Sequence, residues 1–128
     1  YSYKKLGEFL NKCGLDNSAH QRRTETYSKG MRQKVGIAIA LAKEAKVYLL
    51  DEPASGLDPL ASNELSGLLR KLSSEGAAIL MASHDIFRVR ETCNRIGIIK
   101  NGALVKEMDT SEVSTNELEN IYIEYMQN

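Results

Sequence analysis

The sequence of 128 residues lacks the features that direct a chain into a membrane or onto nucleic acid. Its 17 basic and 17 acidic residues give a formal net charge of zero, so its composition predicts no cationic surface for a polyanion. The longest apolar run, residues 77–82, is far too short to span a bilayer, and no signal-peptide pattern opens the sequence. Any role at a membrane is therefore expected to be peripheral, through a partner that crosses the bilayer.

Cysteine is also scarce, with only two in the sequence. Cys13 and Cys93 form no C-x-x-C pair and have no nearby histidine, so their spacing suggests no metal site. We expect two reduced thiols in a cytosolic protein. The hydrophobic content of 42% and the charged content of 27% are those of an ordinary soluble globular domain.

The first part of the sequence predicts two helices separated by a polar segment. Apolar residues recur at helical spacing over residues 3–13, and Gly14 suits the end of that helix because glycine tolerates a positive φ. Residues 16–26 are polar and irregular. Ser28 is a good N-cap for a second helix that runs to about Lys43, since its hydroxyl can accept an unpaired backbone N–H. The expected apolar face of this second helix consists of Met31, Val35, Ala38, Ile39 and Ala42.

Two strands with a helix between them follow. Residues 47–51 form an apolar run that predicts a buried strand, and residues 77–82 predict a second strand that is buried on both faces. Between them, Asp58 and Pro59 suit the cap and the first turn of a helix. The apolar stripe of that helix comprises Ala61, Leu65, Leu68, Leu69 and Leu72, and Gly76 closes it.

The last third of the sequence predicts a short helix, a hairpin and a terminal helix. The short helix covers residues 85–93, a strand begins at residues 96–99, and Asn101-Gly102 is a strong signal for a hairpin that returns over residues 103–107. The alternation of strands and helices indicates an α/β fold with a parallel core and a helical piece in front. The terminal helix has a capping box at Ser114-Thr115-Asn116-Glu117 and an apolar face of Leu118, Ile121, Tyr122 and Tyr125.

Asp51 and Glu52 are the first candidate site residues, because they come directly after an apolar strand. Burying a charge is unfavourable unless it is paired or bound to a metal, so the two acids predict a site at the edge where ligands of open α/β sheets bind. On this dipeptide alone, an acidic strand end that caps local N–H groups is the better explanation of the pattern.

Ser28 and Gly30 mark a second candidate. Glycine permits close approach of the backbone, and a helix N-terminus presents unpaired N–H groups to anions. A capped surface helix is the alternative explanation for Ser-x-Gly in isolation. Asp58 and His84 are also ambiguous by themselves, since Asp58 suits a helix cap and a lone histidine is usually a surface or hydrogen-bonded polar residue.

Taken in order, these segments resemble the second half of an ATP-binding-cassette (ABC) ATPase. The segment Tyr27-Ser28-Lys29-Gly30-Met31 stands where that family has Leu-Ser-Gly-Gly-Gln, so the serine and the second glycine match, whereas Met31 cannot make the hydrogen bonds of an amide. The strand ending in Asp51-Glu52-Pro53, the segment Ser55-Gly56-Leu57-Asp58-Pro59 and then Ser83-His84-Asp85 follow in the family's order. The match covers about residues 3–125.

The resemblance implies a P-loop NTPase-like α/β fold with a partial parallel sheet. Residues 1–46 would form part of the helical subdomain with the signature motif. Residues 47–128 would form the C-terminal part of the ATPase core, ending in a hairpin and a helix.

The resemblance also implies ATP and Mg²⁺ as ligands and a role for each candidate residue. Asp51 would help to hold the metal, Glu52 would polarise the attacking water, and His84 would hydrogen-bond the γ-phosphate.

The remaining candidates would act across a dimer. Ser28, Lys29 and Gly30 would form the signature segment, which contacts a nucleotide held by the opposite protomer, with Lys29 adding a positive charge. Asp58 would lie in the loop that communicates between protomers.

The sequence contains no G-x-x-x-x-G-K-[ST] phosphate loop, and its nine glycines never form one. We therefore expect these residues to be the carboxyl-terminal portion of a longer protein. Without the strand that leads to the phosphate loop, the predicted strands at 77–82 and 95–99 would expose unpaired edges and apolar faces. The fragment alone is expected to be marginally stable, rearranged or filled by another chain, to bind MgATP negligibly and to be inactive.

For the intact protein, the resemblance implies the ATP-hydrolysing subunit of an ABC transporter, in a branch of exporters with a separate membrane subunit. Its expected partners are a second ATPase subunit and a membrane-spanning permease, with no nucleic acid, and its expected location is cytoplasmic and peripheral at the inner face of the cell membrane. Two alternatives remain open from the sequence: a non-transport ABC ATPase acting in DNA repair or translation, and a non-catalytic interaction module.

Overall fold

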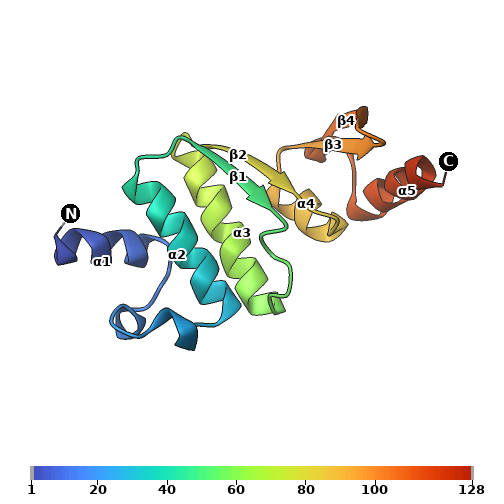
Figure 1. The fold of residues 1–128 in the computed structure, drawn as a ribbon. Coiled ribbons are helices and arrows are strands. Elements are labelled where there is room, and N and C mark those ends of the chain that lie inside the picture. Colours follow the sequence, from blue (N-terminus) through green and yellow to red (C-terminus); the bar gives the residue numbers. More distant parts are fainter. Residues whose placement is uncertain (1, 128) are drawn as a thin grey trace. The chain divides into compact units, whose positions relative to one another are not determined.

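The computed structural model describes residues 2–127, which form two compact units that divide between Ala82 and Ser83. The first unit combines helices with a small parallel sheet, and the second combines a β-hairpin with two helices (Figure 1). Within the described range, no helix is both long enough and apolar enough to cross a bilayer. The expected subdomain division into residues 1–46 and 47–128 stays a prediction.

Side-chain caps determine where the two main helices of the first unit begin. The Ser28 hydroxyl accepts the Met31 backbone N–H at 3.2 Å, and the Asp58 carboxylate accepts the Ala61 N–H at 2.7 Å. Both expected caps are therefore confirmed. The elements of this unit are α1 (Tyr3–Lys12), η1 (Asn17–Ala19), η2 (Thr24–Thr26), α2 (Lys29–Ala42), β1 (Val47–Asp51), α3 (Pro59–Ser74) and β2 (Ala78–Ala82).

Residues with positive φ follow the C-terminal ends of the three helices. Gly14 after α1 has φ +84°, and Gly76 after α3 has φ +101°, as expected for glycines that end helices. After α2 the same position is held by Glu44, whose φ is 58°. A side chain with a Cβ is strained in this left-handed conformation, so the end of α2 is less favourable than the other two.

The core of the first unit lies between the helices and one face of the sheet. The helices α2 and α3 lie side by side (Figure 1), and the strands β1 and β2 pair in parallel with Val47 opposite Ala78 and Asp51 opposite Ala82. Tyr48 on β1 is only 4% exposed. The buried cluster comprises Cys13, Ile37, Ala38, Tyr48, Leu65, Leu68, Leu69 and Leu72.

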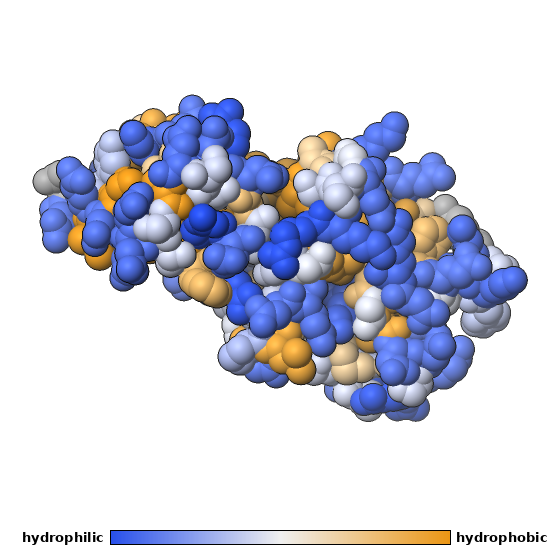
Figure 2. All heavy atoms as spheres, turned by 180° about the vertical axis from the view of Figure 1, so that it is seen from behind, coloured by the Kyte–Doolittle hydropathy of each residue, from blue (hydrophilic) through white to orange (hydrophobic). Residues whose placement is uncertain are grey.

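The expectation that residues 47–51 form a buried strand and that residues 77–82 are buried on both faces is wrong. Leu49 is 74% exposed and Leu80 is 70% exposed, because the helices of the described residues cover only the face that carries Tyr48. The strand β2 pairs only with β1, so its second edge is unpaired within residues 2–127. Figure 2 shows separate apolar areas among mostly hydrophilic side chains on the face that it draws.

The expected apolar face of α2 is correct only in part. Ala38 is buried, but Ile39 is 53% exposed and Ile37 is buried in its place. The helix contributes to two clusters, since Met31 and Val35 pack near its start against the polar segment, and Ile37 and Ala38 pack near its end in the main core. Because α2 contacts two different clusters, its buried residues do not lie on a single face of the helix.

The second unit is built around the predicted hairpin. Asn101 and Gly102, with φ of 51° and 78°, form the tight turn between two antiparallel strands. The helix caps of this unit are also as predicted, with Asp85 accepting the Arg88 N–H at 3.1 Å and Ser114 accepting the Glu117 N–H at 3.2 Å. Its core consists of Ile96, Ile98, Met108 and Leu118. Its elements are α4 (Ile86–Thr92), β3 (Arg95–Lys100), β4 (Ala103–Asp109), η3 (Thr110–Glu112) and α5 (Thr115–Met126).

Candidate functional site

The two candidate acids lie at the carboxyl end of β1. Asp51 is the last residue of that strand, and its side chain is exposed. The backbone N–H of Glu52 still donates to Ala82 O at 2.8 Å, which holds the start of the following loop against β2. Both carboxylates therefore begin at the edge where the parallel strands end, which is the edge where α/β sheets bind ligands.

Glu52 has a strained backbone. Its φ is 46°, a left-handed conformation that is uncommon for a residue with a Cβ and that concentrates at functional sites. The chain turns sharply at this residue, so the separation of the Asp51 and Glu52 side chains depends on the turn as well as on strand alternation. Nothing in the local sequence distinguishes Glu52 as a residue with positive φ.

A tight loop leads from Glu52 to the cap of α3. The Ser55 N–H donates to Glu52 O at 3.1 Å, and the Leu57 N–H donates to Ala54 O at 3.1 Å. Gly56, with φ +74°, supplies the left-handed residue that this loop needs. The loop ends at Asp58, which caps α3.

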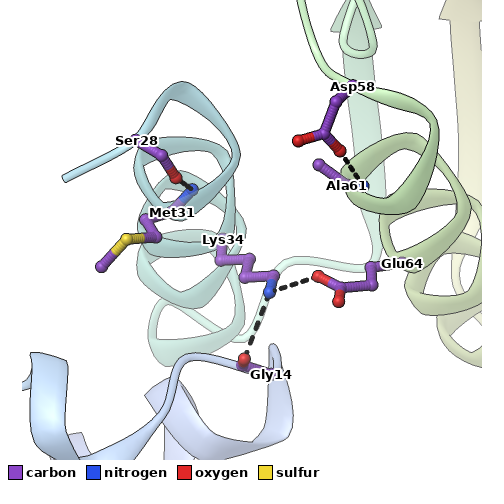
Figure 3. A network of polar contacts seen from close by, with 7 residues as sticks. All are labelled: Gly14, Ser28, Met31, Lys34, Asp58, Ala61 and Glu64. Atoms are coloured by element: carbon purple, nitrogen blue, oxygen red, sulfur yellow. Dashed lines mark hydrogen bonds and ion pairs between the residues drawn. The ribbon is translucent and has the colours of Figure 1, made fainter.

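The start of α2 lies directly against the start of α3. A Cβ added at Gly30 would lie 3.3 Å from the Cβ of Ala61 and 3.8 Å from Leu57, so a glycine allows the two helix starts to approach closely. In Figure 3, Ser28 and Asp58 stand at the first turns of these neighbouring helices. The fold thus brings the signature segment close to the loop that follows the two acids.

Two further contacts fasten α2 to this loop. The Lys29 side chain lies over Gly56, as shown by the distance of 3.0 Å between Lys29 Nζ and the position that a Cβ would take at Gly56. The Gln33 side-chain amide donates to Pro53 O at 2.9 Å. The predicted site residues Ser28, Lys29, Gly30 and Asp58 therefore gather around one loop, and Asp51 and Glu52 open that loop.

A polar network supports this arrangement from one side. Lys34 Nζ on α2 contacts Glu64 Oε2 on α3 at 2.8 Å and donates to Gly14 O after α1 at 3.3 Å (Figure 3). The side chain of Lys34 is only 19% exposed, so this ion pair is better shielded than an ordinary surface pair. No local signal in the sequence points to Gln33, Lys34 and Glu64, since their partners are 20 and 30 residues away.

His84 belongs to the second unit. It stands between Ser83, whose hydroxyl accepts the Asp85 N–H at 3.1 Å, and Asp85, which caps α4. The His84 side chain is exposed. Its assignment to the same site as Asp51 rests on sequence order and stays a prediction.

The cysteines take no part in this site. Both are free thiols, as expected, and burial raises the pKa of Cys13 to about 11 and also raises the pKa of Cys93. A thiol with a raised pKa stays protonated at neutral pH and is a poor nucleophile or metal ligand.

Within residues 2–127, no group of three or more His, Cys, Asp or Glu side chains is placed to hold a metal ion. Magnesium does not need such a group, because it keeps several waters and is usually bound through one or two carboxylates together with phosphate oxygens. A single exposed carboxylate at a strand end, such as that of Asp51, fits this requirement.

The parallel strands, the acids at their carboxyl ends and the capped helices packed on the next loop define an α/β fold of the P-loop NTPase type. A family model described as "AAA domain, putative AbiEii toxin, Type IV TA system" matches residues 16–89. Since this match spans more than half of the sequence, the chain belongs to this family of AAA domains.

Its curated relatives are ATP-binding proteins of ABC transporters. The uncharacterized ABC transporter ATP-binding protein YhcH of Bacillus subtilis (strain 168) is 34% identical over 125 residues, which cover 97% of this chain and 41% of the relative. The lantibiotic transport ATP-binding protein SrtF of Streptococcus pyogenes is 41% identical over 105 residues, which cover 80% of this chain and 45% of the relative. The chain thus spans less than half the length of these relatives.

A solved structure agrees with this assignment. The cbiO1 protein of Clostridium perfringens, described as part of the ABC transporter complex cbiONQ, matches with a TM-score of 0.77 and 33% identity, over 85% of this chain and 43% of that chain. The expected resemblance to ABC ATPases and the expected fold class are confirmed.

Proposed function

We propose that this chain forms the part of an ABC ATPase that carries the signature segment and the acids after the catalytic strand, and that the whole protein hydrolyses ATP to power transport across a membrane. The observation that carries the proposal is the packing of the α2 start on the loop that follows Asp51 and Glu52, through Lys29 on Gly56 and Gly30 on Ala61. This packing supports the proposal because it joins the anion-attracting start of α2 to the loop that begins directly after two carboxylates suited to metal and water.

Asp51 and Glu52 have different tasks in this proposal. Asp51 offers a hard oxygen ligand to Mg²⁺, directly or through water. When bound, Mg²⁺ would neutralise part of the negative charge of the phosphates. Glu52 accepts a hydrogen bond from the attacking water and polarises it, and the turn at its own backbone orients the carboxylate. His84 donates a hydrogen bond to the γ-phosphate.

The remaining site residues act across a dimer of ATPase subunits. Ser28 and Gly30 present the α2 N-terminus to the γ-phosphate of a nucleotide that the second subunit holds. Lys29 braces this segment against Gly56 and adds a positive charge near the phosphate. Asp58 carries the contact between protomers while it caps α3.

In this proposal, the residues that make most of the contacts with the phosphates of the nucleotide lie outside this chain. No phosphate loop occurs in these 128 residues, and without one Asp51 and Glu52 present negative charge to a polyanion. The chain alone therefore binds MgATP negligibly and does not hydrolyse it.

The membrane-spanning partner is a separate permease, and the ATPase acts on the cytoplasmic side of the membrane. The names of the relatives, among them a lantibiotic transport ATP-binding protein, support transport over a role in DNA repair or translation. Assignment to an exporter branch rests on the Tyr-Ser-Lys-Gly-Met form of the signature segment.

The test is Glu52→Gln in the complete ABC ATPase that contains this chain. We expect ATP turnover to fall by about two orders of magnitude or more, which is the usual contribution of a residue that acts on the attacking water, while MgATP still binds. Glu44→Gln, on an exposed residue at the far end of α2, is the matched control and keeps its turnover. Wild-type turnover in Glu52→Gln would remove Glu52 from its role.

A further inference from the structure

A pocket of about 250 Å³ lies at the end of the parallel strands opposite to Asp51 and Glu52. The C-terminal ends of α2 and α3 and the residues that lead into β1 and β2 form its walls, so it is contained within the first unit. Its lining residues are Leu41, Ala45, Lys46, Tyr48, Leu72, Glu75, Gly76 and Ala77.

Tyr48 is the unusual member of this lining. Its side chain belongs to the main core and is 4% exposed, yet its hydroxyl is buried without a hydrogen-bond partner in the described part of the chain. Buried tyrosine hydroxyls usually have a partner, and a buried polar group without one costs about 1–3 kcal/mol. The Tyr48 hydroxyl is therefore available to form a hydrogen bond with a ligand.

Two charged side chains line this pocket, and for one of them, Glu75, the structure gives an ion-pair partner, whereas the other, Lys46, is exposed. Glu75 at the wall forms an ion pair with Lys12 of α1 at 2.8 Å, and both side chains are about half exposed, at 42% and 40%. The hydrogen bond that the Lys12 ammonium donates lowers the pKa of the Glu75 carboxyl group. Burial raises the pKa of Tyr48, so the phenol stays neutral at neutral pH. A cationic ligand would have to compete with Lys12 for Glu75, whereas a neutral ligand would not.

The lining offers both apolar and polar contacts. Leu41, Ala45, Leu72 and Ala77 are apolar, whereas Lys46, Tyr48 and Glu75 carry polar atoms. A molecule with an apolar body can contact Leu41 and Leu72 while one polar atom reaches the phenol.

We propose that this pocket binds a small neutral amphipathic molecule, with an apolar ring or short chain against Leu41 and Leu72 and a single hydroxyl or carbonyl that hydrogen-bonds the Tyr48 hydroxyl. Glu75 stands at the wall with Lys12 as its ion-pair partner, and these exposed side chains move aside to admit the ligand to the phenol. This site is independent of the proposed nucleotide site.

The experiment uses phenol as the polar probe and toluene as its apolar counterpart, with binding to the complete ABC ATPase that contains this chain followed by NMR chemical-shift titration. Tyr48→Phe removes only the hydroxyl, so we expect phenol to bind about five- to tenfold more weakly while toluene binding is unchanged. Ala77→Leu fills the pocket from its wall and abolishes binding of both probes, and circular dichroism verifies that each variant is folded.

Each of the other outcomes overturns the proposal. Absence of phenol binding to the wild-type chain would exclude the site. Equal phenol affinity in the wild type and Tyr48→Phe would exclude the hydrogen bond. Retained binding in folded Ala77→Leu would place the probe elsewhere on the molecule.

Discussion

Lys29 lies over Gly56, so the first residue of α2 touches the loop between the acidic strand and α3. In the ABC pattern a glycine stands at the position of Lys29, so this contact is specific to the variant signature segment of this chain. The contact joins two segments that are 27 positions apart in the sequence and that both belong to the proposed nucleotide site.

The first prediction concerns Gly56→Ala. The substitution adds a Cβ in a left-handed conformation and within 3.0 Å of Lys29 Nζ, so we expect a loss of about 1–2 kcal/mol in the free energy of unfolding. Urea unfolding measures this loss. The double variant Lys29→Ala with Gly56→Ala removes the contact but keeps the backbone strain, so it should recover only part of the loss. Full recovery would show that the backbone strain contributes negligibly to the loss. No recovery would show that the contact with Lys29 contributes negligibly.

The second prediction concerns the end of α2. Glu44 has a φ of 58° at the position where α1 and α3 have glycine, so Glu44→Gly should stabilise the chain by about 1 kcal/mol. Glu44→Ala is the matched control, because it removes the same charge but keeps a Cβ, and it should give no comparable gain. Thermal unfolding distinguishes the two variants, and an equal gain in both would attribute the effect to charge.

Local signals allowed much of the fold to be predicted. The caps at Ser28, Asp58 and Ser114 satisfy nearby N–H groups, and the Asn101-Gly102 turn needs only its own two residues, so neither depends on distant parts of the chain. Burial does depend on distant parts. Leu49 lies in an apolar run of the sequence that predicts a buried strand. Its side chain is exposed in the structure, because only one face of its sheet is covered.

The site was predictable in its residue types but not in its contacts. The order of Ser28, Asp51 and Asp58 indicated which segments carry chemistry, by resemblance to a family. The turn at Glu52 and the Lys34–Glu64 pair have no local signal, because a positive φ at glutamate and a pairing across 30 residues are both set by tertiary packing.

The third prediction concerns alkaline pH. Cys13 is 2% exposed, and burial raises the pKa of its thiol from 9.0 to about 11. Because the unfolded thiol loses its proton first, stability is fully present below about pH 9 and falls as the pH rises towards 11. The pKa of Lys12, raised by its hydrogen bond to Glu75, and the pKa of Tyr48, raised by burial, contribute in the same direction.

Urea midpoints measured from about pH 8 to about pH 11 test this prediction. Cys13→Ala lowers stability at every pH through the lost packing, but its midpoint should fall less steeply above pH 9 than that of the wild type. Parallel slopes in the two proteins would show that the thiol of Cys13 does not titrate differently in the folded and unfolded states.

The last prediction separates the two roles of Asp58. As the N-cap of α3 it accepts the Ala61 N–H at 2.7 Å, so Asp58→Ala should cost about 1 kcal/mol of stability. Asparagine caps helices as well as aspartate does, so Asp58→Asn should keep the stability while removing the charge. If Asp58 also carries contact between protomers, the complete ABC ATPase with Asp58→Asn will fold normally and lose ATP turnover several-fold. Ser114→Ala removes a comparable cap in the second unit and should lower stability without that loss of turnover. Wild-type turnover in Asp58→Asn would restrict Asp58 to its structural role at the start of α3.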